Sequence, residues 1–199
     1  MKKLQFIAYG IFLTGLFLKF LHLPRNAYIM MAGILILLII HSISVFKKEN
    51  KFAALKGFAT ASWMILLLFV LKFWPFLTPL LVLSSVLTVI TLREAYKLKQ
   101  LHHVKLLVIS SVLCMTCYLM PTDERYELIN IKCNHHLEKD YFSWDKYSWF
   151  LYQNGHTSEA VKASDKALEI ARKSGDTEYI EFISKHNKLI KDNNWGSFK

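Results

Sequence analysis

The chain has 199 residues, of which 53% are hydrophobic and 20% are charged, and its mean hydropathy is +0.26. This composition is too apolar for a disordered chain, and only 7 Gly, 4 Pro and 3 Cys exclude collagen and a disulfide-stapled secreted domain. The apolar residues form runs longer than the helices of a soluble core, so we expect a membrane protein.

The positive charge belongs to the apolar part of the chain. Residues 1–120 contain 13 Lys or Arg and 2 Asp or Glu, whereas residues 121–199 contain 12 and 13, within a total net charge of +10. The basic residues of the first part stand in short tracts between apolar runs, where they act as topology signals. A nucleic-acid-binding protein gathers them on one face of a folded domain instead, so we exclude nucleic acid as a partner.

Five apolar runs in residues 1–120 are predicted to span the membrane, because each approaches the length that crosses about 30 Å of hydrocarbon as a helix. The shortest does so if Lys105 extends toward the headgroups. Basic tracts favour the cytoplasmic side, which predicts a bacterial inner-membrane protein with a cytoplasmic N-terminus and a periplasmic C-terminal domain. The predicted spans cover about residues 4–23, 27–46, 57–74, 76–92 and 104–120.

The first two spans resemble the next two. The tripeptide Leu18-Lys19-Phe20 recurs as Leu71-Lys72-Phe73, and each copy precedes a proline turn and a returning apolar run. A duplicated hairpin and a chance similarity between two apolar hairpins both explain this pattern.

Residues 121–199 are predicted to form a small soluble domain of three helices. The first covers about residues 137–152, the second begins at Thr157 or Ser158 and ends at Gly175, and the third is capped by Asp176. Helical spacing places Tyr179, Phe182, Ile183 and Ile190 on the inner face of the third helix. Residues 121–136 carry no clear pattern.

Gly155, Glu159-Ala160 and Ala167-Leu168 follow one another at a spacing that resembles the second half of a tetratricopeptide repeat. The resemblance implies two antiparallel helices in close approach, with aromatic residues on the first. A lone repeat also implies a partner, a neighbouring copy, or the third helix as a lid. The expected fold class is therefore all-α: a polytopic helical membrane protein with a small tetratricopeptide-like soluble domain.

Four polar side chains in the predicted spans are candidates for function, since charged and polar groups in hydrocarbon are costly. Lys19 and His22 are three residues apart and are expected on one helix face. Snorkelling toward the headgroups is the alternative for Lys19 and for Lys72. For His41 the alternative is a neutral imidazole that hydrogen-bonds to a neighbouring helix.

Lys19-x-x-His22-x-Pro24, between two apolar spans, resembles the N-terminal hairpin of the gliding-motility GldL family over about the first 45 residues. The resemblance implies an oligomeric membrane stator of a proton-driven motor, built around a second membrane protein. Members of that family use a carboxylate in the second helix, near Leu37 of this chain. No Asp or Glu occurs here from Met1 to Lys48.

Seven aromatic residues within residues 141–152 cannot share one helix face. Three explanations remain open for the residues that point away from the core of the domain. They anchor the domain at the membrane interface, they form a surface for a protein partner, or their helix is sandwiched and makes contacts on both faces. The partner-binding candidates are Trp144, Tyr147, Trp149 and Tyr152.

Cys133, His135 and His136 resemble metal ligands, but the predicted topology puts His102 and His103 on the other side of the membrane. A closed site needs four ligands, so we expect no metal and no cofactor. The sequence contains no phosphate loop and no clustered catalytic pair or triad on one side of the membrane, so we expect no enzyme.

Two functions follow from these patterns. The first is an integral membrane interaction or scaffold protein whose partners are the lipid bilayer and a protein, either another chain or a second copy. The alternative is a component of an ion- or proton-coupled motor, channel or transporter, in which Lys19, His22, His41 and Lys72 line a polar path.

Overall fold

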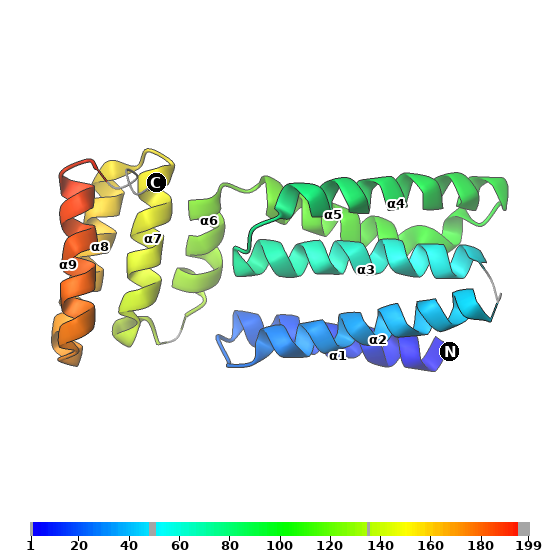
Figure 1. The fold of residues 1–199 in the computed structure, drawn as a ribbon, viewed down its shortest axis with the longest axis horizontal. Helices are drawn as coiled ribbons and strands as arrows, with labels where there is room; N and C mark the ends of the chain where they lie inside the picture. The colour runs from blue at the N-terminus through cyan, green and yellow to red at the C-terminus, as the bar shows by residue number, and fades with distance from the viewer. Residues whose placement is uncertain (1, 48–50, 135, 195–199) are drawn as a thin grey trace. The chain divides into compact units, whose positions relative to one another are not determined.

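The computed structural model of the chain describes residues 2–47, 51–134 and 136–194 (Figure 1). Within these ranges it contains nine α-helices and no strand, which confirms the predicted all-α class. The chain divides into two compact units. Unit 1 comprises Met1–Lys19 and Leu23–Leu119, and unit 2 comprises Phe20–His22 and Met120–Lys199.

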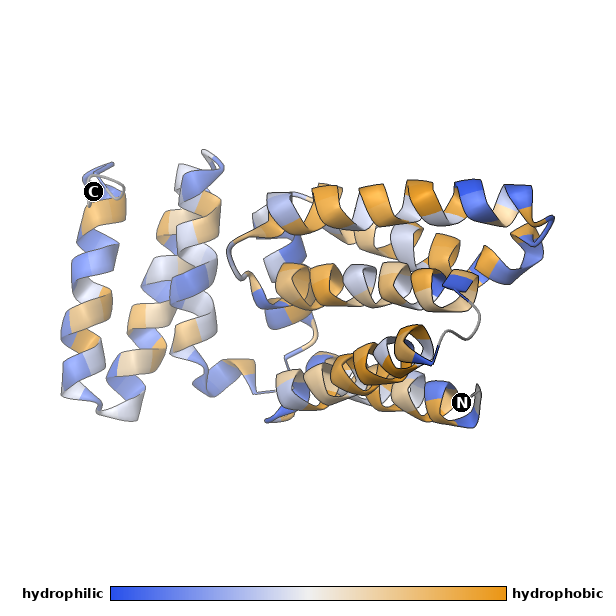
Figure 2. Cartoon of the chain, turned by 45° about the vertical axis from the view of Figure 1, so that its right-hand side comes forward, coloured by the Kyte–Doolittle hydropathy of each residue, from blue (hydrophilic) through white to orange (hydrophobic). Residues whose placement is uncertain are grey.

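Unit 1 consists of five helices that are long and apolar enough to cross a membrane, as the sequence predicts, and Figure 2 shows the hydrophobic residues along them. Several extend beyond the apolar runs into the basic tracts, because hydropathy marks the lipid-compatible part of a helix rather than its ends. The helices are α1 (Lys2–Phe20), α2 (Asn26–Phe46), α3 (Lys51–Lys72), α4 (Leu77–Lys97) and α5 (Lys105–Leu119), with a 3₁₀ turn, η1 (Leu101–Val104), before α5.

The two proline turns of unit 1 have the same backbone geometry. In the first, Leu23 N–H donates to Leu18 O at 3.0 Å, and in the second Trp74 N–H donates to Phe69 O at the same distance. Helix α4 begins and ends 51 residues after α2, at 77 against 26 and at 97 against 46. The equivalent positions are therefore offset by 51 residues, so the two copies of the Leu-Lys-Phe tripeptide are not structurally equivalent.

Close approach between helices α1 and α2 depends on glycines. A Cβ atom built on Gly33 would lie 2.7 Å from Ala8 O and 2.8 Å from Phe12 N, and one on Gly15 would lie 2.7 Å from Met30 N. Small residues at such crossings let helix backbones pack tightly in a membrane. Helix α3 is the most buried of the five, and Trp63 Nε1 on it donates to Thr88 Oγ1 on α4 at 2.7 Å.

Unit 2 contains the remaining helices: α6 (Thr122–Tyr126), α7 (Tyr141–Gln153), α8 (Thr157–Ser174) and α9 (Thr177–Lys191). A π-helical turn, η2 (Glu127–Lys132), and a 3₁₀ turn, η3 (Leu137–Lys139), lie between α6 and α7. Helix α8 packs against both α7 and α9. The core between them is formed by Leu151, Ala160, Ala163, Ala167, Ala171, Ile183 and Ile190.

The helix ends of unit 2 follow local capping chemistry. Gly175 has φ 74° and ends α8, and the Asp176 carboxylate accepts from Tyr179 N–H at 3.3 Å, which confirms both predicted signals. The first long helix starts at Tyr141 instead of residue 137, because Asp140 caps it by accepting from Ser143 N–H at 2.9 Å. At the start of α8 the N-cap residue is His156, in place of Thr157 or Ser158.

Candidate functional site

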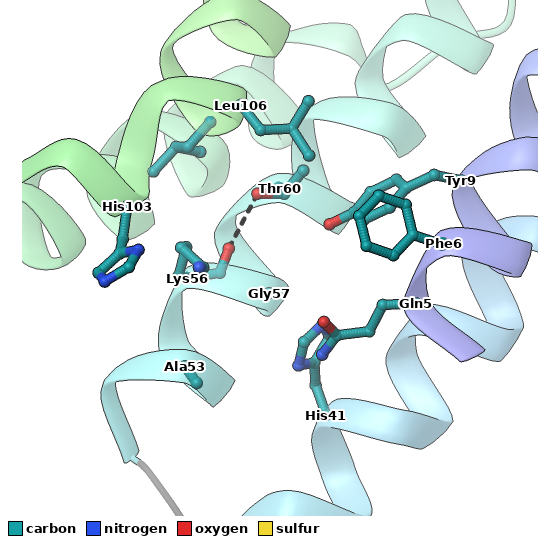
Figure 3. Close-up of a pocket in the computed structure, with 11 residues that line it drawn as sticks. Gln5, Phe6, Tyr9, His41, Ala53, Lys56, Gly57, Thr60, His103 and Leu106 are labelled. Atoms are coloured by element: carbon teal, nitrogen blue, oxygen red, sulfur yellow. Dashed lines mark hydrogen bonds between the residues drawn. The ribbon is translucent and has the colours of Figure 1, made fainter. Parts of the chain in front are cut away.

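A polar pocket of about 210 Å³ lies within unit 1, among helices α1, α2 and α3 and the segment that leads into α5 (Figure 3). Its polar side chains come from four separate parts of the sequence, and Figure 3 shows them arranged around one space. Among them, the sequence marks His41 as an intramembrane candidate and raises His103 only as a possible metal ligand. The polar members are Gln5 and Tyr9 on α1, His41 on α2, Lys56 and Thr60 on α3, and His103 on η1.

His41 is buried, with 3% of its surface exposed. Its ring packs against Gly57 so closely that a Cβ atom there would overlap the imidazole, and the Phe58 ring centroid is 6.0 Å away. The buried Nε2 atom has no hydrogen-bond partner among the described residues. The expected hydrogen bond from His41 to a neighbouring helix is therefore not formed at Nε2, because the facing position is a glycine.

The electrostatic character of the pocket is basic. Lys56 brings a charged ammonium group, and the imidazole rings of His41 and His103 add nitrogen atoms that can form hydrogen bonds. The residues that line the described pocket include no carboxylate. Thr60 Oγ1 donates to Lys56 O at 3.0 Å, and the Tyr9 phenol oxygen points toward Thr60 (Figure 3). Such a set of donors can hold an anionic oxygen, and it does not pair a nucleophile with a base.

An apolar groove of about 440 Å³ adjoins this pocket and shares Phe6, Tyr9 and Leu106 with it. The groove runs between α1, α3 and α5. The pocket with polar side chains and the apolar groove therefore adjoin at these three residues. Its remaining lining residues are Gly10, Phe12, Leu13, Leu16, Trp63, Met64, Leu67, Ile109, Ser110 and Leu113.

The structure does not place Lys19 and His22 on one helix face. Helix α1 ends at Phe20, and His22 has φ 55° and belongs to unit 2, where its Nε2 donates to Ile129 O at 2.6 Å. The prediction is wrong because the bond from Leu23 N–H to Leu18 O closes the helix before His22. Lys19 is 7% exposed and Lys72 is partly buried, and neither lines the pocket around His41.

Unit 2 presents a groove of about 400 Å³ between α7 and α9. The aromatic side chains Phe142 and Phe182 are 50% and 48% exposed. A hydrogen bond within the groove joins His186 Nδ1 to a carboxylate oxygen of Asp145 at 2.9 Å. The lining residues are Phe142, Asp145, Lys146, Trp149, Phe182 and His186.

Of the four aromatic partner candidates, Trp149 lines this groove. Trp144, Tyr147 and Tyr152 are partly buried and pack against the core of unit 2. Burial, together with the nearby Glu127 carboxylate, to which the phenol donates a hydrogen bond, raises the pKa of Tyr147 to about 12. Tyr147 therefore makes its contacts within unit 2 and does not line the groove.

Sequence reasoning missed Phe142 and assigned Phe182 to the inner face of the third helix. The structure buries the predicted Ile183 and Ile190, together with Asn187, on α9, and leaves Phe182 48% exposed. These positions follow the i, i+4, i+7 pattern of a single face, which leaves Phe182 beside it. That spacing was the signal available in the sequence.

The histidine and cysteine candidates do not form a metal centre in the described part of the chain, where no group of three or more His, Cys, Asp or Glu side chains is gathered. His102 and His103 have ring centroids 3.9 Å apart, and His103 contributes to the polar pocket instead. His135 lies outside the described residues.

Comparisons with known proteins assign no family to the chain. No protein-family model, curated protein or solved structure matches it. The resemblances to the GldL hairpin and to a tetratricopeptide half-repeat therefore stay predictions.

Proposed function

We propose that this protein is a membrane-anchored scaffold. Unit 1 holds the chain in the bilayer with five helices, and unit 2 binds a protein partner in the groove between α7 and α9. The positive tracts favour a cytoplasmic N-terminus and place unit 2 on the periplasmic side of a bacterial inner membrane. The observation that carries the proposal is the pair of half-exposed aromatic rings, Phe142 and Phe182, in that groove.

The chemistry of the groove suits a protein ligand. Exposed aromatic rings supply large contact areas with few rotatable bonds, and such residues dominate the binding energy of protein interfaces. The rings are held in place by their neighbours: Phe142 packs edge-on against Tyr179 at 4.5 Å between centroids, and Phe182 packs against His186 at 4.2 Å. The Asp145–His186 pair adds a polar group that fixes the orientation of a bound segment.

The arrangement of the helices also supports the tetratricopeptide-like part of the proposal. Helix α8 packs against α7 on one side and against α9 on the other. Stacked helical repeats bury their faces in this way, each helix against its neighbours, and they bind partners on the surface that the stacking creates. In this proposal α9 takes the place of the first helix of a following repeat.

A site-specific photocrosslinking amino acid placed at Lys146, a groove residue, tests the proposal in intact cells. We expect one discrete crosslinked product, and we expect Phe142→Ala together with Phe182→Ala to reduce it at least tenfold, because losing an aromatic anchor costs about 2 kcal/mol or more. Leu128→Ala is the matched control, since Leu128 is a 44% exposed apolar residue of unit 2 outside the groove. A product that survives the double substitution would count against the groove.

The second candidate, an ion- or proton-coupled component resembling the GldL family, is favoured by the protonatable His41 inside unit 1. Proton flux in proteoliposomes separates the two functions. Flux lost in His41→Ala but kept after deletion of residues 121–199 would favour the coupled component. Unchanged flux in His41→Ala, together with a crosslinked product that depends on Phe142 and Phe182, favours the scaffold.

A further inference from the structure

The pocket around His41 and the adjoining apolar groove together match the two parts of an amphiphilic molecule, a polar headgroup and an apolar chain. The pocket is basic and polar, the groove is almost entirely apolar, and the two share Phe6, Tyr9 and Leu106. The polar end is formed by the N-terminal parts of α1 and α3, the C-terminal part of α2 and the turn before α5. The groove extends from there along α1, α3 and α5 into their C-terminal halves, reaching Leu16, Leu67 and Leu113.

We propose that unit 1 binds one anionic phospholipid of the surrounding bilayer in this space. The phosphate lies in the pocket with Lys56, His41 and His103, and an acyl chain lies in the groove. The Lys56 ammonium and an imidazole N–H of His103 can donate to phosphate oxygens there, whereas Nε2 of His41 packs against Gly57.

The charge around the pocket agrees with this ligand. Lys56 supplies a permanent positive charge, and the described residues that line the pocket include no carboxylate that would repel phosphate. The basic tracts that precede the first hairpin, separate the two hairpins and follow the second also lie at this end of unit 1. Basic pockets between transmembrane helices are the type of site that binds anionic headgroups. Gln5 and Tyr9 contribute neutral hydrogen-bonding groups beside the cations.

The apolar groove distinguishes a lipid from a free anion. A soluble phosphate compound would use only the pocket of about 210 Å³ and would leave the groove of about 440 Å³ without a ligand. An acyl chain instead covers the apolar side chains of the groove. The helices that form the groove are apolar enough to span a membrane, so a lipid can enter it from the side.

Native mass spectrometry of the full-length protein, with phosphatidylglycerol and phosphatidylcholine of equal chain length, tests the headgroup. We expect at least fivefold more bound phosphatidylglycerol than phosphatidylcholine. Lys56→Gln should remove this preference and Lys56→Arg should retain it. Lys105→Gln is the matched control, because Lys105 is an exposed lysine close in sequence to His103 that does not line the pocket.

The groove is tested separately. Ser110→Phe places a large side chain in the groove, and we expect it to reduce bound phosphatidylglycerol at least fivefold while Lys56 is intact. A second measurement uses the unmodified protein, so that it does not depend on a variant that misfolds. Because Trp63 lines the groove, brominated acyl chains carried by phosphatidylglycerol should quench its fluorescence more than the same chains carried by phosphatidylcholine. Trp63→Phe should abolish that difference.

Three results would overturn the proposal. The first is equal binding and equal quenching by the two lipids. The second is a loss of preference in Lys105→Gln as large as that in Lys56→Gln. The third is displacement of bound phosphatidylglycerol by millimolar inorganic phosphate, which would show that the pocket holds a free anion and that the groove contributes nothing.

Discussion

The packing of α1 against α2 predicts that Gly33→Ala destabilises the protein although alanine is the better helix former. The added methyl group would lie 2.7 Å from Ala8 O and 2.8 Å from Phe12 N, where ordinary contact begins at 3.4 Å. Both neighbours are backbone atoms, so no side chain can rotate away. The two helices must therefore separate by about 0.7 Å, the difference between 3.4 and 2.7 Å.

This separation gives the size of the effect. A gap of about 0.5–1 Å removes roughly a quarter to a half of the dispersion energy of each contact across an interface. Overpacked sites lose about 1–3 kcal/mol. Because the obstruction at Gly33 is rigid backbone, we expect a loss of about 2–3 kcal/mol in the free energy of unfolding.

Gly10 on α1 provides the matched control. A Cβ atom built on Gly10 meets nothing within 4 Å, so Gly10→Ala should leave stability unchanged or raise it by up to about 1 kcal/mol through helix propensity. Unfolding of both full-length variants in mixed detergent micelles, followed by circular dichroism, measures the two effects. A Gly33→Ala protein within about 0.5 kcal/mol of wild type, or an equal loss in Gly10→Ala, would refute the proposed packing of α1 on α2.

Two further predictions concern single contacts. Gly57→Ala should lower the free energy of unfolding by about 1–3 kcal/mol, because the added methyl group overlaps the His41 ring. Since the obstruction is a side chain, adding His41→Ala to the same chain should recover most of this loss. Additive losses in a double-mutant cycle would contradict this. In unit 2, hydrogen bonding to Lys191, followed by Asn187, holds the pKa of Asp165 below its ordinary 3.8. This exposed carboxylate therefore stabilises the protein above pH 3.8, and the contribution is lost as the pH falls through the lowered pKa. Asp165→Asn should lower the free energy of unfolding by about 0.5 kcal/mol at pH 7. When unfolding is measured below the lowered pKa of Asp165, the wild-type and Asp165→Asn proteins should be equally stable.

Local signals in the sequence predicted the helices but placed some of their ends wrongly. Gly175 and Asp176 identify a stop and a start because their chemistry acts within one turn of the chain. The start of α7 was missed because Asp140, and not the apolar pattern, caps it. The similarity between the hairpins was inferred from a tripeptide, but the matching turn hydrogen bonds at Leu23 and Trp74 align the two hairpins in a different register.

The aromatic groove of unit 2 was predicted only in part. The density of aromatic residues on α7 pointed to a surface with a role in binding, and Trp149 is part of the groove. Phe182 on α9 completes it from another helix. Which aromatic rings of α7 face the core and which face the groove depends on where α8 and α9 pack, and this information is absent from the spacing within one helix.

The sequence by itself determined that the first part of the chain contains five membrane-length helices, because the length of an apolar run and the charge at its ends are local properties. Only the tertiary structure decided which of their polar residues meet. Helices that are apolar on all sides have no face marked by periodicity, so Tyr9, His41, Lys56 and His103 could not be assigned to one pocket in advance. Their meeting depends on how closely the helices approach, and the small residues between the helices set that distance.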